Sequence, residues 1–180
     1  MHVEHGRPKD CADRTARELA VYDLLDRLDI PYARVDHAPA EIMEVCADID
    51  KVLNCRICKN LFLCNRQQTA FYLLMMPGDK PFKTKELSAQ IGSARLSFAP
   101  AEKMVEYLGL YPGSVSVMGL MNDSENKVQL LVDQDLFREE YIGCHPCVNT
   151  SSLKLRRTDI FETFLTAVKH NYLSVELHGE

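Results

Sequence analysis

The spacing of apolar residues predicts a chain in which helices and strands are interspersed. After a polar start, Leu19, Tyr22 and Leu25 recur every three residues, which is typical of an amphipathic helix, and Asp13 precedes them as an N-cap. The segment 69–76 is almost continuously apolar and predicts a strand buried on both faces. Other helices are predicted at about 41–52, 84–91, 100–109 and 159–170, and other strands at 32–36, 57–64, 94–98, 114–120 and 128–132.

This order of elements predicts an α+β fold in a single compact domain. The chain has 180 residues, of which 46% are hydrophobic, an ordinary share for a globular protein. A domain of this size buries about two thirds of its unfolded surface, so it needs no disulfide or metal in order to fold. We expect residues 1–12 to form a mobile tail and residues 13–180 to form the domain.

Composition and charge narrow the possible functions. No apolar run approaches the ~20 residues of a membrane span, so we expect a cytoplasmic protein whose seven cysteines are reduced thiols. The net charge of −5 weighs against a protein that coats duplex nucleic acid, but not against one that grips a strand end through a few phosphates. Three basic clusters, which we interpret as solvated surface, are Lys51, Arg56, Lys59 and Arg66; Lys80, Lys83 and Lys85; and Lys154, Arg156 and Arg157.

Two CxxC pairs, Cys55–Cys58 and Cys144–Cys147, contain enough thiolates for a tetrahedral zinc site. The first pair runs into an apolar strand, where residues three apart point to opposite faces, and the pairs are far apart in the chain. We therefore favour buried cysteines that act as small hydrophobic residues, with no metal and no other cofactor. A zinc-binding module that is not an enzyme remains the alternative from another class.

Lys59 lies inside an otherwise apolar predicted strand, where burying a charge is costly. Strand alternation places Lys59 on one face with Leu61 and places Asn60 on the other face or at the rim. A lysine that lines a cavity can hold a phosphate or carboxylate, or polarise a carbonyl oxygen. A lysine that only reaches the edge of the sheet is an equally good interpretation of the pattern alone.

Two further segments combine small residues with hydrogen-bonding groups. The stretch Gly113–Asp123 lets a ligand approach the backbone closely. The stretch Gly143–Ser152 places a histidine, His145, close to an amide and three hydroxyls, and a histidine near neutral pKa can position a water or hold a substrate hydroxyl.

Together, these segments resemble the YbaK-type prolyl-tRNA editing family of free-standing aminoacyl-tRNA deacylases. The resemblance rests on CKNLFL at 58–63, PGSVSVMGLMND at 112–123 and GCHPCVNTSSL at 143–153, supported by 77–92 and 94–100. Each motif alone is loose, but three in the same order over about residues 14–170 are specific.

The resemblance implies a domain built on a curved, barrel-like mixed sheet flanked by helices. It also implies hydrolysis of a small amino acid from a mischarged tRNA, alanine on tRNA-Pro above all. The implied partners are the acceptor end of that tRNA and prolyl-tRNA synthetase. The implied catalytic residues are Lys59 and His145, and the implied substrate-binding residues are Asn60, Gly113, Ser114, Val115, Ser116, Val117, Met118, Gly119, Gly143 and Asn149.

The chain departs from the family at one place. Many relatives carry a threonine shortly after a motif like His37-Ala38-Pro39, where this chain has Ile42 or Met43. The mechanism we favour uses no covalent nucleophile: a positioned water attacks, while Lys59 and backbone amides near Gly119 or Gly143 stabilise charge. The alternatives are a thioester route through a cysteine and a relative that clears cysteine from tRNA-Pro.

Overall fold

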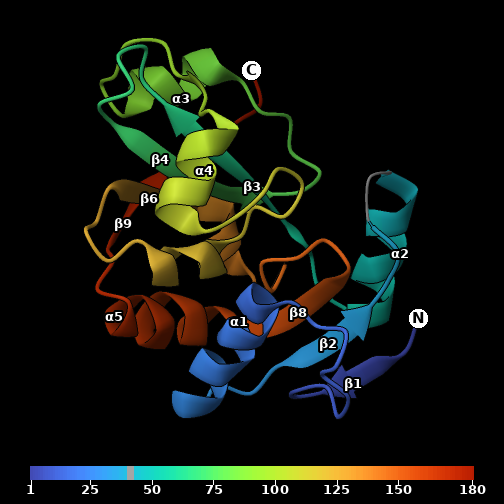
Figure 1. Cartoon of the computed structure of the whole chain (residues 1–180). Coiled ribbons are helices and arrows are strands. Elements are labelled where there is room, and N and C mark those ends of the chain that lie inside the picture. Colours follow the sequence, from blue (N-terminus) through green and yellow to red (C-terminus); the bar gives the residue numbers. More distant parts are fainter. Residues whose placement is uncertain (40–42) are drawn as a thin grey trace.

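The computed structural model describes residues 1–39 and 43–180, and in this part of the chain the strands form two sheets (Figure 1). The four-stranded sheet is antiparallel, whereas the five-stranded sheet is mixed, with parallel pairing of β4 with β6 and of β6 with β9. In spatial order, the four-stranded sheet contains β1 (Val3–His5), β2 (Ala33–Asp36), β8 (Ser151–Arg156) and β7 (Tyr141–Cys144). The five-stranded sheet contains β5 (Ser97–Phe98), β3 (Cys58–Cys64), β4 (Phe71–Pro77), β6 (Val128–Asp133) and β9 (Tyr172–Val175).

Helices surround both sheets. Local capping fixes two of their ends: Thr15 Oγ1 accepts a hydrogen bond from the Glu18 amide at the start of α1, and Gly109 ends α4 with a φ of 63°. Thr15 is therefore the N-cap, and the prediction of Asp13 is wrong by two residues. The helices are α1 (Ala16–Arg27), α2 (Met43–Leu53), α3 (Thr84–Gln90), α4 (Ala101–Leu108) and α5 (Leu165–Ala167), with short helical turns η1 (Val117–Asn122), η2 (Gln134–Arg138) and η3 (Asp159–Phe164).

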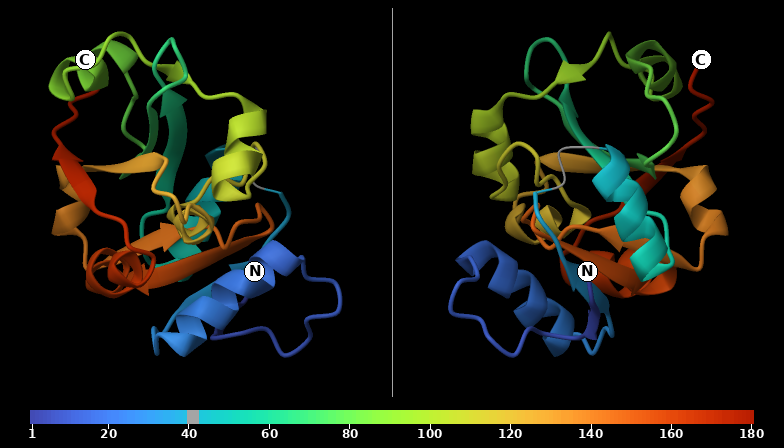
Figure 2. Two further views of the ribbon diagram at one scale, coloured as in Figure 1. Left: turned by 60° about the vertical axis from the view of Figure 1, so that its left-hand side comes forward. Right: turned by 90° about the vertical axis from the view of Figure 1, so that its right-hand side faces the viewer.

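The largest core lies between the two sheets. Leu153 and Leu155 of β8 face Leu73 and Leu130 of the five-stranded sheet within it, and α1, α4 and η3 contribute further side chains. A second core packs α3 and the C-terminal segment on the other face of the five-stranded sheet, through Leu87 and similar residues. A third core packs α2 on the outer face of the four-stranded sheet, at the right in Figure 1 and in front of that sheet in the right-hand view of Figure 2.

The predicted mixed α+β domain is confirmed, with differences in detail. The expected N-terminal tail contains the edge strand β1, which pairs with β2. The strands β7, β8 and β9 are not predicted by the hydrophobic pattern. The expected barrel-like closure is not confirmed: within residues 1–39 and 43–180 the strands form two separate sheets rather than a closed barrel.

The predicted strand at 114–120 is wrong, since this segment leads into the 3₁₀ helix η1. The Ser116 hydroxyl accepts a hydrogen bond from the Met118 amide at 3.2 Å, which caps the turn. Serine side chains that bond to a nearby backbone amide compete with strand pairing in this way.

The two sheets contact each other at Gly143 of β7, which lies against Ile57, the residue before β3. Ile57 forms an isolated parallel bridge with Gly143, and the Gly143 amide donates to the Arg56 carbonyl at 2.8 Å. A Cβ atom at position 143 would lie 2.3 Å from Ile57 Cδ1 and 3.0 Å from the Arg56 carbonyl oxygen. Only glycine allows this approach, which fixes the start of β3 against β7.

Gly143→Ala is expected to lower the free energy of unfolding by about 1–3 kcal/mol because the backbone over it cannot move away freely. Urea denaturation measures the change. Ile57→Ala in the same chain should return part of that loss, because it removes the nearest clashing atom, and a double-mutant cycle isolates this coupling. Purely additive effects of the two substitutions would contradict the proposed contact.

Candidate active site

His145 follows β7 and is held on one side by the first residues of β8. Its Nδ1 atom lies 3.0 Å from the Ser151 carbonyl oxygen and 3.4 Å from Ser152 Oγ. A carbonyl oxygen only accepts, so Nδ1 carries the proton of the neutral imidazole. Nε2 is then left with its lone pair, has no hydrogen-bond partner within residues 1–39 and 43–180, and is not sealed from solvent. His145 therefore offers a basic nitrogen to a bound water or substrate.

A second histidine completes a chain of hydrogen bonds. His37 Nε2 lies 2.9 Å from Ser152 Oγ, and His37 Nδ1 lies 2.7 Å from the Ala38 carbonyl oxygen. The same rule makes His37 Nδ1 a donor and its Nε2 an acceptor, so the Ser152 hydroxyl donates to His37 and accepts from His145. The two rings lie 6.3 Å apart between centroids. This network fixes the tautomer of both rings while they are neutral.

Burial lowers the pKa of His145, the bond to the Ser151 carbonyl opposes this shift, and nearby His37 adds to the lowering. The imidazole is therefore neutral at pH 7, which is the form that accepts a proton.

The loop before η1 is hydrogen-bonded to the backbone of His145. The Ser116 hydroxyl donates to the His145 carbonyl oxygen at 2.5 Å, and Ser116 is fully buried. Gly113 has a φ of 89°, and a Cβ there would lie 3.8 Å from Asn149 Nδ2. The segments 113–119 and 143–149, which the resemblance implies bind substrate, thus lie in contact with each other.

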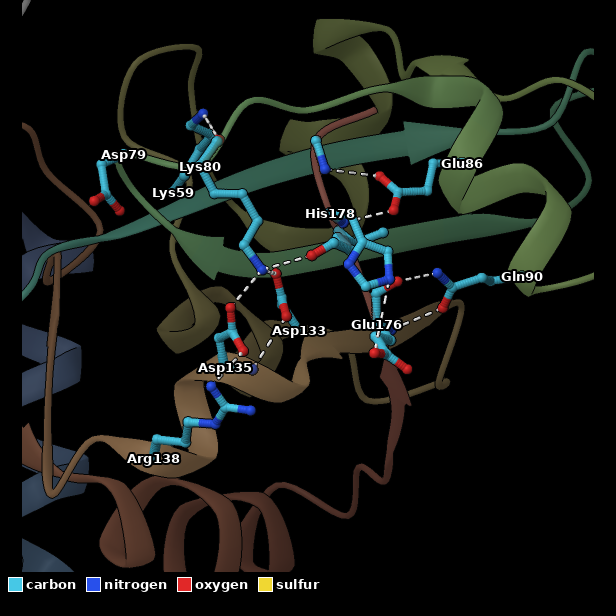
Figure 3. Close-up of polar contacts among 12 residues, drawn as sticks. Lys59, Asp79, Lys80, Glu86, Gln90, Asp133, Asp135, Arg138, Glu176 and His178 are labelled. Carbon is cyan, nitrogen blue, oxygen red and sulfur yellow. Dashed lines mark hydrogen bonds and ion pairs between the residues drawn. The ribbon is translucent and has the colours of Figure 1, made fainter.

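Lys59 and Asn60 lie on opposite faces of β3, as strand alternation predicts. Lys59 lies on the face of Leu61, toward α3, and its ammonium group donates to the Lys80 carbonyl oxygen at 2.7 Å (Figure 3). Asn60 lies between Cys58 and Phe62 on the face of the main core, and its Oδ1 atom is buried without a hydrogen-bond partner in the described part of the chain. Among residues 1–39 and 43–180 no hydrogen bond or ion pair joins Lys59 to His145.

The cysteines lie largely in the interior. Cys58, Cys144 and Cys147 are buried, and burial raises the pKa of each thiol, that of Cys147 to about 12. Thiols with raised pKa values are poor nucleophiles and poor metal ligands at neutral pH. In the described residues, no three histidine, cysteine or acidic side chains come together to hold a metal ion.

Sequence reasoning missed His37 and Ser152 as members of the site. The two residues are 115 positions apart, and neither local pattern nor spacing connects them. A cavity of about 400 Å³ adjoins His37. Its lining residues are Asp10, Asp13, Arg14, Glu18, Asp36, His37 and Thr150. Ile42 and the side chain of Met43, where relatives carry a threonine, lie outside what the structure describes.

Comparison with known proteins identifies the class of this site. Residues 37–163 match the model of the aminoacyl-tRNA editing domain family, and this match covers more than half of the chain. The chain belongs to the aminoacyl-tRNA editing domain family, and it is an aminoacyl-tRNA deacylase, a hydrolase that cleaves the ester between amino acid and tRNA. No helix among the described residues is long and apolar enough to cross a membrane.

Individual relatives refine this comparison. The prolyl-tRNA editing protein ProX of Acetoanaerobium sticklandii is 32% identical over 158 residues, which cover 88% of this chain and 96% of the relative. The prolyl-tRNA synthetase associated domain-containing protein 1 of Danio rerio is 27% identical over 150 residues, covering 82% of this chain and 80% of that protein. A crystal structure of a candidate trans-editing enzyme for prolyl tRNA synthetase shares the fold, with a TM-score of 0.67 at 12% identity over 91% of this chain and 99% of that one.

The pH dependence of deacylation should report the neutral form of His145. The pKa of His145 is lowered from 6.5, so the active neutral form predominates at all pH values above this lowered pKa. We therefore expect kcat/KM to fall only as the pH drops through an apparent pKa below 6.5. The measurement is a pH profile of initial rates. In His145→Asn, kcat/KM at pH 7 should fall by at least about tenfold, and the decrease of kcat/KM at acid pH should disappear. His2→Asn, at the exposed N-terminus, should change neither kcat/KM at pH 7 nor the pH profile. An unchanged acid limb in His145→Asn would exclude His145 as the titrating group.

Proposed function

We propose that this deacylase acts in trans on mischarged tRNA-Pro and removes alanine. The proposal is supported by the names of the relatives, which refer to prolyl-tRNA editing or to association with prolyl-tRNA synthetase. A proline site on a synthetase cannot strongly reject the smaller alanine, since losing a methylene or two changes binding by only ~1–3 kcal/mol. A second site that admits alanine and excludes proline by size solves this problem.

The observation that carries the proposal is a tightly packed segment that Ser116 joins to the His145 carbonyl and that is proposed to form the pocket wall. Val117, Met118 and Leu120 of η1 are buried, and Val115 is half-buried just before them. A Cβ at Gly119 would lie 2.6 Å from Leu110 Cδ1, so this wall has little room to yield. Overlap of a larger amino acid with packed side chains is strongly unfavourable, which favours exclusion of proline.

The proposed hydrolysis of the ester uses His145 Nε2 as a general base. A water held by His145 Nε2 attacks the ester carbonyl carbon and gives its proton to that nitrogen. The tetrahedral intermediate then expels the ribose oxygen, which takes the proton, and the neighbouring ribose hydroxyl assists. No cysteine is needed, because aminoacyl esters are labile and a positioned water suffices.

The donors for the developing oxyanion differ from those the sequence indicates. The Gly119 amide already donates to the Ser116 carbonyl at 3.0 Å, and the Gly143 amide donates to Arg56. We therefore assign the oxyanion to Asn149 Nδ2, which has no hydrogen-bond partner within the described ranges 1–39 and 43–180. Asn60 Oδ1, which has no partner in the described part of the chain, is suited to accept a hydrogen bond from the substrate's α-ammonium group.

Lys59 is proposed to hold the substrate electrostatically. Its only described bond is to a backbone carbonyl of the turn after β4, so the ammonium charge is not neutralised by an acid within the described chain. The acceptor end of tRNA-Pro supplies the anionic partner, and prolyl-tRNA synthetase is a second proposed partner.

Lys59→Ala is expected to leave the fold intact and to cut deacylation by at least about tenfold, or roughly 1.4 kcal/mol of barrier. Single-turnover rates with Ala-tRNA(Pro) provide the measurement. Lys51→Ala, which removes an exposed lysine at the end of α2, serves as the control. Activity of Lys59→Ala within twofold of wild type would remove Lys59 from the site.

The substrate preference tests the proposed function itself. Ala-tRNA(Pro) should be hydrolysed at least ~30-fold faster than Pro-tRNA(Pro), which corresponds to about 2 kcal/mol of discrimination. A panel of mischarged tRNAs assayed side by side gives the ratio. Equal rates for alanine and proline esters would contradict exclusion by size, and a preference for Cys-tRNA(Pro) would place the chain with cysteine-clearing relatives.

A further inference from the structure

A second cavity lies on the outer face of the four-stranded sheet, and none of the described residues that line it is assigned to the site. It has a volume of about 640 Å³. Strand register places His5, Ala33 and Lys154 in one row across β1, β2 and β8, and places Arg156 opposite Tyr141 in a neighbouring row. The lining residues are His5, Gly6, Asp26, Ile30, Pro31, Tyr32, Ala33, Tyr141, Lys154 and Arg156.

Two cations converge on one aromatic ring in this cavity. Lys154 Nζ lies 4.5 Å and the Arg156 guanidinium carbon lies 5.7 Å from the centroid of the Tyr141 ring. Neither cation forms an ion pair with an acid among residues 1–39 and 43–180. Among the described residues of the lining, Asp26 is the one acid, and its Oδ1 accepts from the Tyr32 hydroxyl at 3.2 Å.

This arrangement is unusual in a chain with a net charge of −5, where acids are in excess. Like charges that lie together without an ion-pair partner repel one another, and a bound anion removes that repulsion. A tyrosine ring beside them adds a surface on which a base can stack. The cavity therefore suits an anion that carries a planar ring or lies next to one.

We propose that Lys154, Arg156 and Tyr141 form a second contact site for the sugar-phosphate backbone of the tRNA near its aminoacylated end. This proposal rests on the proposed function only because it requires tRNA to be the substrate. Ser152, which bonds to His37, lies on the same strand and the same face as Lys154 and Arg156. At about 3.3 Å per residue, Lys154 lies ~7 Å and Arg156 ~13 Å further along β8. Nucleotides that precede the terminal adenosine can span this distance while the ester lies at His145.

The test compares a long and a short substrate. In Lys154→Gln/Arg156→Gln, kcat/KM for full-length Ala-tRNA(Pro) should fall by about tenfold at low salt. The rate for alanyl-adenosine, which lacks the nucleotides before the terminal adenosine, should stay within twofold of wild type. The slope of log affinity for uncharged tRNA-Pro against log salt should flatten by about 1.4, because two phosphate contacts are lost. Tyr141→Leu should weaken tRNA binding without changing that slope.

The matched control removes the same charge elsewhere. Lys83→Gln/Lys85→Gln alters another basic surface, beside α3, and should change tRNA binding less than twofold. Equal losses in both double variants would show a general charge effect and overturn the proposal, as would equal losses on the long and short substrates. Displacement of tRNA by micromolar AMP would assign the cavity to a free nucleotide and would also overturn it.

Failure of the proposed function is distinguishable from failure of this site. If wild-type protein hydrolyses none of the mischarged tRNAs, the function is wrong, but binding of uncharged tRNA-Pro still decides the contact site. If wild type is active and the Lys154/Arg156 variant binds tRNA with unchanged affinity and salt slope, the contact site is wrong and the function stands.

Discussion

The close contact between the Ile57 backbone and Gly143 is the constraint on which the rest of the structure depends. It joins the start of β3 to β7 through a backbone bridge that any side chain at position 143 would disturb. The strand β3 carries Asn60, and β7 leads directly into His145. The two halves of the candidate site belong to different sheets, so this contact sets the distance between them. A glycine in a motif that looks like part of a ligand pocket therefore acts first as a structural joint.

Much of the fold was predictable because it depends on local patterns. The ends of α4 follow from Pro100 and Gly109, and the hairpin of β3 and β4 follows from two apolar runs around a polar turn. The strands β7 and β8 were not predictable, since Gly143 and Ser151 lack strand propensity and pair only in the assembled sheet. The 3₁₀ turn η1 is capped by the Ser116 hydroxyl, and alternation of apolar residues does not reveal this cap.

In the candidate site, too, some features could be predicted from the local sequence and others depend on the assembled fold. The sequence around His145 indicated a candidate histidine, whereas a pocket shared with the stretch 113–119 was implied only by the family resemblance. The hydrogen bonds that orient the His145 ring were not predictable, because His37 and Ser152 are 115 positions apart in the sequence. The backbone donors were expected near Gly119 or Gly143, and the amides of these two glycines are already bonded to carbonyls. Local sequence indicates which groups are present, whereas the fold decides which of their atoms remain free.

Lys80 links distant parts of the molecule in a way that bears on its local stability. Its ammonium group binds Asp133, Asp135 and the Leu177 carbonyl, while its own carbonyl holds Lys59 (Figure 3). Burial alone would lower the pKa of Lys80, but the bonds to Asp133 and Asp135 raise it. Opening of the C-terminal segment removes one acceptor from Lys80 and loosens the turn that positions Lys59. Amide hydrogen exchange near the C-terminus is therefore coupled to the mobility of a side chain proposed to bind substrate.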